Sequence, residues 1–317
     1  MNKKAYVIQL LTSPQARLLI THDEYIAALL AYFPIGNQSV ITSSDEPKTY
    51  KECIAKEIQP ITSSSSIPIT IDFTSNEIEP GTLAYHRIKG LITADSWWYF
   101  SSKQLEQDLI LAEENPNITC HFLHISSGGG EAWYLDRLSE TMRSLSKPIY
   151  SFVEKVCGSA AYYIGCHGSV MKTLTQNDII GCIGSMIGFW DIDPYFEAMG
   201  FRKIEEYARI SDLKNKKYND LKGGKPQQYI DEELEPLAEQ FREEVRISRC
   251  QLTSLDLDHP ALRGETFDAT HAIEVGLIDG IVTFNEALAE AYELGEKWHK
   301  ARNQQRNRVL SLSLIHI

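Results

Sequence analysis

Two junctions between an apolar strand and a helix, both built from small residues, constrain this chain most. The first, Ser126–Gly130, follows the apolar run Ile118–Ile125, and the second, Gly158–Gly165, follows Ile149–Val153. Three consecutive glycines leave backbone N–H groups uncovered by side chains, while Ser159 stands in the partial positive charge of a helix N-terminus. The pair of junctions therefore predicts a nucleophile facing an oxyanion hole, the two parts that acyl-transfer chemistry needs.

Strand-like and helix-like segments alternate along the chain from about residue 81. The apolar runs predict strands at Leu83–Ile92, Ile118–Ile125, Ile149–Val153, Val170–Met171 and Ile278–Val282. The amphipathic segments predict helices at Ser101–Glu114, Glu131–Leu145, Asp231–Arg249, Thr270–Val275 and from Asn285 onward. This alternation is typical of an α/β domain with a largely parallel sheet.

Composition divides the chain into segments. Residues 1–58 carry no recognisable motif and are expected to form an N-terminal accessory region. The Pro- and Ser-rich start of residues 59–80 predicts a linker, and residues 81–290 form the main domain. Residues 291–311 begin a charged, helical C-terminal extension, and residues 312–317 resemble the translated end of a sequencing adapter, so they are left out of the fold prediction.

Charge, hydropathy and cysteine usage restrict the class of protein. Among 317 residues, 43 acidic and 31 basic side chains give a net charge of −12, which argues against a nucleic-acid-binding protein. No apolar run reaches the ~18 residues of a membrane span, and Thr12–Arg17 interrupts the apolar N-terminus too early for a secretory signal. None of the six cysteines forms a CxxC pair, as expected of free thiols in a reducing compartment. We therefore expect a cytoplasmic protein without a membrane anchor.

Ser159 is the candidate nucleophile. A serine that begins a helix is most often a simple N-cap, and the glycine turn upstream is what favours a catalytic role here. Ala160 would supply one N–H group to the oxyanion, and Gly128 and Gly129 would supply the others, with no side chain to obstruct a peptide.

A serine nucleophile needs a general base, and two kinds of residue are available. None of the following histidines has an Asp partner that the sequence identifies, which favours structural roles for them: His121, His124, His167 and His271. The alternative is a lysine that desolvation keeps neutral, so that it accepts a proton near neutral pH. The segment Tyr207–Tyr218 offers Lys214, Lys216 and Lys217, and composition alone leaves the choice among them open.

Five motifs in order resemble the signal peptide peptidase A family of Ser–Lys endopeptidases, which includes the phage prohead proteases. They are Ser126–Gly129, Lys147–Pro148, Gly158–Gly165, Gly181–Gly184 and Arg263–Gly280, within a match over about residues 80–290. The resemblance implies a Clp/crotonase-like α/β fold, a superhelix of strand-strand-helix units with an N-terminal accessory region. Clp proteases would place a histidine at Gly184, and crotonase-type acyl-CoA enzymes need no nucleophilic serine, so both match less well.

The resemblance also implies roles for single residues. The base of that family is a lysine in a Ser-Gly-x-x-Lys setting, which selects Lys214 because Ser211 stands three residues before it. The chain departs from the family where Ser127 replaces a proline, where Ala160 and Ala161 replace two glycines, and where Cys182 replaces a serine that orients the lysine. A thiol is a weak hydrogen-bond partner, so the orienting candidates are Cys182 itself, Ser185 and Ser211.

Residues and resemblance together predict a serine endopeptidase with a Ser159–Lys214 dyad and without a metal or organic cofactor. We expect a homo-oligomer that acts on peptides or unfolded proteins and binds neither nucleic acid nor membrane. The missing anchor favours a phage prohead protease that cleaves capsid scaffold protein, in the host cytoplasm or the prohead. A soluble bacterial peptidase of the same family is the alternative. From another class, a non-catalytic oligomeric assembly protein is the alternative that Cys182 supports.

Overall fold

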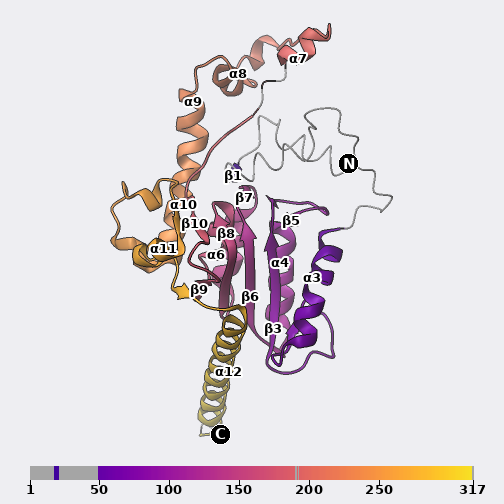
Figure 1. The fold of residues 1–317 in the computed structure, drawn as a ribbon, viewed down its shortest axis with the longest axis vertical. Coiled ribbons are helices and arrows are strands. Elements are labelled where there is room, and N and C mark those ends of the chain that lie inside the picture. Colours follow the sequence, from indigo (N-terminus) through magenta and orange to yellow (C-terminus); the bar gives the residue numbers. More distant parts are fainter. Residues whose placement is uncertain (1–17, 21–48, 190, 192, 316–317) are drawn as a thin grey trace.

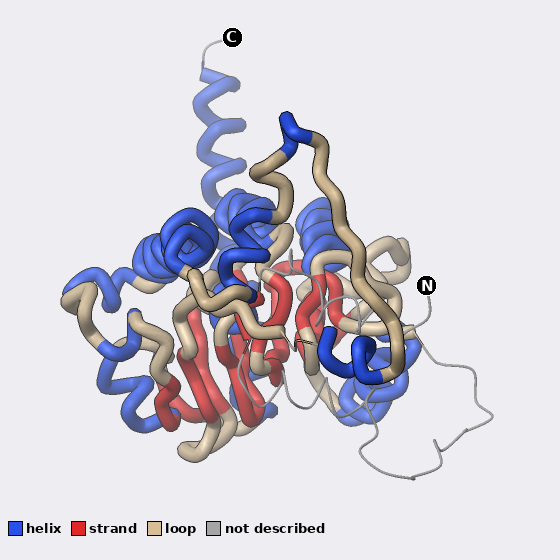
Figure 2. The backbone as a smooth tube through the Cα atoms, turned by 90° about the horizontal axis from the view of Figure 1, so that it is seen from above, coloured by secondary structure: helices blue, strands red, loops and turns tan. Residues whose placement is uncertain are grey.

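The computed structural model describes residues 18–20, 49–189, 191 and 193–315 of the chain. Its centre is a sheet with helices packed on both faces (Figure 1, Figure 2). Six strands lie in order along the main path of this sheet: β11 (Thr266–Asp268), β10 (Ile179–Gly181), β8 (Ile149–Gly158), β6 (Ile118–Ser127), β3 (Thr82–Lys89) and β2 (Ile69–Thr70), while off this path β9 (Val170–Thr173) pairs with β8 and β12 (Gly280–Ile281) with β9. Of these six strands, β11 runs antiparallel to its neighbour and the others pair in parallel. The predicted α/β class with a largely parallel sheet is confirmed.

The two faces of the sheet carry separate apolar cores, because successive side chains of a strand point in opposite directions. On β6, Phe122 and Leu123 are both fully buried, but they belong to different clusters. Phe122 packs with α3 and α12, whereas Leu123 packs with α4, α5, α6 and α10. The bounds of these helices are α3 (Tyr50–Ser64), α4 (Ser102–Glu114), α5 (Leu135–Ser144), α6 (Ala160–Gly165), α10 (Glu235–Ser248) and α12 (Phe284–Ile315). The result is a sheet between two helical layers.

A second, smaller sheet lies beyond the carboxyl ends of β3 and β6 (Figure 1). Its order is β1 (Leu18–Ile20), β7 (Gly129–Glu131), β4 (Ile92–Thr93) and β5 (Phe100–Ser101). The strand β7 begins within the glycine turn, one residue after the end of β6, and β4 begins shortly after the end of β3. Ligands of parallel α/β sheets bind beyond the carboxyl ends of the strands, so this small sheet borders the place where a site is expected.

Most predicted elements are present, with shifted ends. The helix expected at Glu131–Leu145 begins only at Leu135, because Gly129–Glu131 is used as strand β7. The strand expected at Leu83–Ile92 divides into β3 and β4 at Gly90, which has a φ of 69°. The short strands β9 (Val170–Thr173) and β12 (Gly280–Ile281) and the helix α11 (Ala269–Val275) lie close to their expected positions.

The prediction of a linker at residues 59–80 is wrong. Residues 59–64 continue the helix α3, which a Thr49–Glu52 capping box begins. Ile58 on this helix is buried against the sheet, and Phe73 and Ile78 are buried further along the same stretch. The burial of these apolar side chains therefore determines the structure of the stretch despite its Pro- and Ser-rich start, and the stretch packs against the main domain. The proposed boundaries at residues 81 and 290 stay predictions.

Two segments project from the body of the molecule. Residues 186–229, here called the arm, leave the sheet after β10 and return to α10, and they carry α7 (Asp193–Ala198), the short 3-10 turn Arg209–Ser211, α8 (Lys216–Lys222) and α9 (Gln227–Tyr229). Figure 1 shows α7 and α8 beyond one end of the body, while α12 extends from the other end. None of the helices in the described ranges combines the length and apolar character needed to cross a bilayer.

Candidate active site

Ser159 occupies the turn between β8 and α6. Its backbone has a φ of 55° and a ψ of −121°, which a residue with a side chain rarely adopts, and its N–H donates to the carbonyl of Gly181 at 2.8 Å. The side chain is buried, and Oγ has no hydrogen bond of good geometry with any described residue. Strained backbone and an unpartnered buried hydroxyl are costly, and such features concentrate at functional sites.

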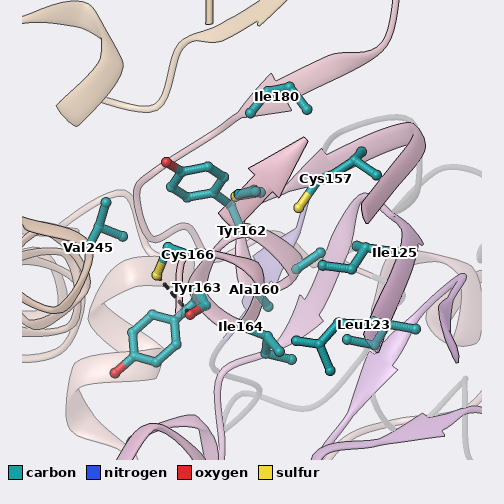
Figure 3. Close-up of a cluster of buried hydrophobic side chains, with 14 of the residues drawn as sticks. Leu123, Ile125, Cys157, Ala160, Tyr162, Tyr163, Ile164, Cys166, Ile180 and Val245 are labelled. Carbon is teal, nitrogen blue, oxygen red and sulfur yellow. Dashed lines mark hydrogen bonds between the residues drawn. The ribbon is translucent and has the colours of Figure 1, made fainter. Parts of the chain in front are cut away.

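The helix α6 that follows Ser159 is fixed deep in the core. Ala160 and Ala161 are fully buried, and the Tyr162 hydroxyl donates to the carbonyl of Leu277 at 2.8 Å. Figure 3 shows Ala160 and Ile164 packed beside side chains of β6 and β8. Because small side chains let the helix approach the strands closely, the N-terminus of α6 has a defined position relative to the glycine turn.

Two of the three glycines in the turn cannot be replaced without strain or a steric clash. Gly129 has a φ of 106°, a conformation that favours glycine, and a Cβ at Gly130 would lie 2.0 Å from the carbonyl oxygen of Ile92. The strand β7, which contains both, packs against α6. The turn therefore lies next to the helix that Ser159 begins, as the predicted oxyanion hole requires.

Ser127 changes which N–H groups of the turn are available. Its hydroxyl donates to the carbonyl of Gly90 at 2.6 Å and accepts the N–H of Gly129 at 3.1 Å. The Gly129 N–H is thereby bonded within the protein, so this one of the three predicted oxyanion donors already has an acceptor. The serine that stands in place of the family's proline thus ties the end of β3 to the turn.

The candidate orienting residues lie in three different places. Cys182 follows β10 with a φ of 58°, and its thiol lies close enough to Ser159 for the two side chains to interact. Burial raises the pKa of this thiol, and the Ser159 side chain partly opposes the rise. Ser185 donates instead to the carbonyl of Leu234 at 2.7 Å, and Ser211 belongs to the arm. The structure therefore brings Cys182 to Ser159, and it assigns Ser185 a bond to the backbone before α10.

Lys214 lies on the arm and is not joined to Ser159 in this structure. Its backbone N–H donates to the carbonyl of Ser211 at 3.0 Å, its side chain is exposed, and it makes no ion pair within the described ranges. The neighbouring lysines are engaged with carboxylates: Lys216 contacts Asp220, and Lys217 lies 2.7 Å from Glu233. These ion pairs favour charged, solvated roles for Lys216 and Lys217, as expected.

The histidines have partners that the sequence did not reveal. The His167 ring lies 2.9 Å from Glu244, and the exposed His271 lies 2.8 Å from Asp268. Burial lowers the pKa values of His121 and His124. His121 bonds to His86 of β3 and Glu113 of α4, and His124 bonds to Tyr85 of β3. None of the bonds that the described residues form links any of these histidines to Ser159.

One feature of the site had no sequence signal. The strand β1, Leu18–Ile20, pairs antiparallel with the whole of β7, beside the glycine turn. Residues 1–58 carry no motif that points to this pairing, because three apolar residues specify neither a strand nor the edge on which it pairs.

Part of the chain matches the sequence model of a known peptidase family. The sequence model of Peptidase family S49 matches residues 141–297, a range that includes Ser159, Cys182 and Lys214. No curated protein matches the chain. Among solved structures, a mutant of the 1510-N membrane-bound stomatin-specific protease in complex with a substrate peptide is similar at a TM-score of 0.41 and 13% identity, covering 66% of this chain and 78% of that one. A member of the enoyl-CoA hydratase/isomerase family is similar at a TM-score of 0.39 and 13% identity, covering 68% of this chain and 73% of that one. The chain belongs to peptidase family S49.

Proposed function

We propose that this peptidase is a serine endopeptidase in which Ser159 is the nucleophile and Lys214 the general base. The observation that carries the proposal is Ser159 itself: a buried hydroxyl with no hydrogen bond of good geometry, on strained backbone, at a helix N-terminus beside the glycine turn. A core serine with only a structural role would normally satisfy its hydroxyl, for instance by capping the helix, and Ser159 makes no such cap.

The proposed reaction runs in two steps. Ser159 Oγ attacks the carbonyl carbon of the peptide bond while neutral Lys214 accepts the hydroxyl proton, and the N–H groups of Gly128 and Ala160 bind the resulting oxyanion. Lysine returns the proton to the leaving amine, and an acyl ester of Ser159 remains. Water, deprotonated by the same lysine, then attacks the ester, releases the carboxylate product and restores the serine.

The dyad requires a movement of the arm or a second chain. A general base has to lie within about 3 Å of the proton that it takes, and a lysine amine is neutral near pH 7 only when it is removed from water. Lys214 is exposed on the arm, so it must be carried to Ser159 and desolvated there. The same requirement supports the homo-oligomer expected from the sequence, because a neighbouring chain can supply both the cover and the lysine.

The test is cleavage of an unfolded protein between pH 7 and 9. We expect Ser159→Ala and Lys214→Ala to lose activity by at least about 10³-fold, as the loss of a nucleophile or base does in other serine peptidases. Lys216→Ala and Lys217→Ala are the matched controls and should keep activity. Activity that survives in Lys214→Ala would exclude this lysine as the base, and an inactive but well-folded wild-type oligomer would favour the non-catalytic assembly protein, to which the Cys182 substitution points.

For the natural setting we propose capsid maturation in a phage prohead, with scaffold protein as the substrate. The support is the resemblance of the motifs to prohead proteases and the long charged helix α12, which extends away from the body. A soluble bacterial peptidase is the alternative. Incubation with a purified phage capsid scaffold protein tests the setting: Ser159-dependent trimming is expected, and a scaffold that stays intact while unfolded casein is cut would contradict it.

A further inference from the structure

The strand β7 has two hydrogen-bonding edges, and both are in use. On one edge, Ile92 of β4 pairs with Gly130. On the other edge, β1 runs antiparallel with Leu18 opposite Glu131, Leu19 opposite Gly130 and Ile20 opposite Gly129. A peptide that is to pair with β7 can therefore do so only where β1 now lies, because each edge of a strand accepts one partner.

The direction of β1 is the direction that a substrate would take. A scissile carbonyl has to reach the oxyanion donors at Gly128 and Ala160, with the acyl part of the peptide leading up to it. Ile20 is the last residue of β1 and lies opposite Gly129, so a peptide that continues along this line next meets Gly128. The segment Leu18–Ile20 thus occupies the edge in the same sense as the residues that precede a cleaved bond.

We propose that Leu18–Ile20 is an internal occupant of the acyl side of the active site, and that an external substrate must displace it. The site then takes extended peptides that add a strand to β7 through backbone hydrogen bonds, as Leu18–Ile20 does. The proposal rests on the proposed peptidase function of Ser159. It makes the strand Leu18–Ile20 a regulator of access to the site.

The energetics fit an exchangeable occupant. Three residue pairs on one edge form only a marginal strand. A tether within the same chain gives an effective concentration in the millimolar range, so such a weak strand still fills the site in most molecules when substrate is scarce. A substrate with a longer apolar strand gains more backbone hydrogen bonds and replaces it.

The test compares Leu19→Pro with Ser43→Pro in the full-length chain. Proline removes the N–H of residue 19 and disfavours the pairing of β1 with β7, whereas residue 43 is not part of β1. We expect Leu19→Pro to lower KM for a quenched unfolded-protein substrate by about threefold to tenfold with little change in kcat, since the site becomes free in all molecules rather than in roughly a tenth to a third of them. Equal KM values for wild type, Leu19→Pro and Ser43→Pro would overturn the proposal.

A binding experiment separates this proposal from the peptidase function. This second experiment uses Ser159→Ala, which cannot cut, with and without the additional Leu19→Pro change. A fluorescent synthetic peptide of residues 15–23 should bind the double variant about threefold to tenfold more tightly than it binds Ser159→Ala alone. Tighter binding without activity in any variant would support the internal occupant while the peptidase mechanism fails. Ser159-dependent activity with unchanged peptide binding would leave the peptidase standing and exclude the internal occupant.

Discussion

At the scale of single residues, backbone conformation decides the site more than side-chain chemistry does. Ser159, Gly129 and Cys182 all have positive φ values, and they lie at the ends of β8, β6 and β10, where the chain turns sharply. The sequence could predict Ser159 and the glycine turn because small residues are needed at such turns. It could not predict that the Ser127 hydroxyl donates to the Gly90 carbonyl while it accepts the Gly129 N–H, because the first bond depends on where the chain lies after the end of β3.

Gly130 offers a direct test of the close approach between β7 and β4. In Gly130→Ala the new Cβ would lie 2.0 Å from the Ile92 carbonyl oxygen, so the two strands must separate. We expect a loss of about 1–3 kcal/mol in the free energy of unfolding, measured by urea denaturation, together with loss of activity. Gly184→Ala is the matched control, since its nearest new contact is 3.7 Å and should be tolerated. Equal stability of the two variants would contradict the geometry of the turn.

At the scale of elements, α6 is held by helices that lie far away in the sequence. His167, just after α6, contacts Glu244 of α10, and Arg143 of α5 contacts the same carboxylate. The periodicity of apolar residues predicts α5, α6 and α10 well, because each buries one face. It does not predict β7 or β1, which are too short to have a period and exist only through their pairing partners. The helix α3 was missed, because Pro60 and the serines that follow it indicated a linker.

The contact between His167 and Glu244 predicts a pH-dependent stability. Burial lowers the pKa of His167, but Cys166 and Glu244 raise it more, to about 10, while His167 and Arg143 outweigh burial and lower the pKa of Glu244 to about 2. The stability that His167 adds to the fold is fully present below about pH 6.5 and is lost as the pH rises through 10. The stability that Glu244 adds is fully present above about pH 4.5 and is lost as the pH falls through 2.

We therefore expect Glu244→Gln to cost about 3–5 kcal/mol in the free energy of unfolding near pH 6, because it leaves a buried histidine without its carboxylate. The difference from wild type should shrink toward pH 10 and toward pH 2. Asp220→Asn, which removes an exposed partner of Lys216, is the control and should cost less than about 1 kcal/mol. Urea denaturation at several pH values measures both, and a pH-independent loss in Glu244→Gln would exclude the charged pair.

At the scale of the whole molecule, the arm carries apolar side chains that no other described part of the chain covers. Ile204, Ile210 and Leu213 expose 72%, 95% and 72% of their surface on the segment that carries Lys214. The arm has some internal order, since the rings of Phe189 and Tyr218 lie 5.1 Å apart. Contiguous exposed apolar side chains usually mark a surface that another protein covers. No sequence pattern could give the placement of the arm, because an amphipathic segment is compatible with packing on its own body or on a neighbour.

The arm predicts that the lysine reaches the serine of another chain. If each site takes Ser159 from one chain and Lys214 from its neighbour, an equal mixture of inactive Ser159→Ala and Lys214→Ala chains should regain about a quarter of wild-type activity, because a quarter of neighbouring pairs carry both intact residues. The double variant mixed with Lys214→Ala is the control and should stay inactive. Specific activity of the wild type should also rise with chain concentration, since a dilute chain has an exposed lysine and no base beside Ser159. A mixture that stays inactive, with wild-type activity independent of concentration, would instead require the arm to fold back onto its own body, so that the exposed apolar side chains pack against the site they serve.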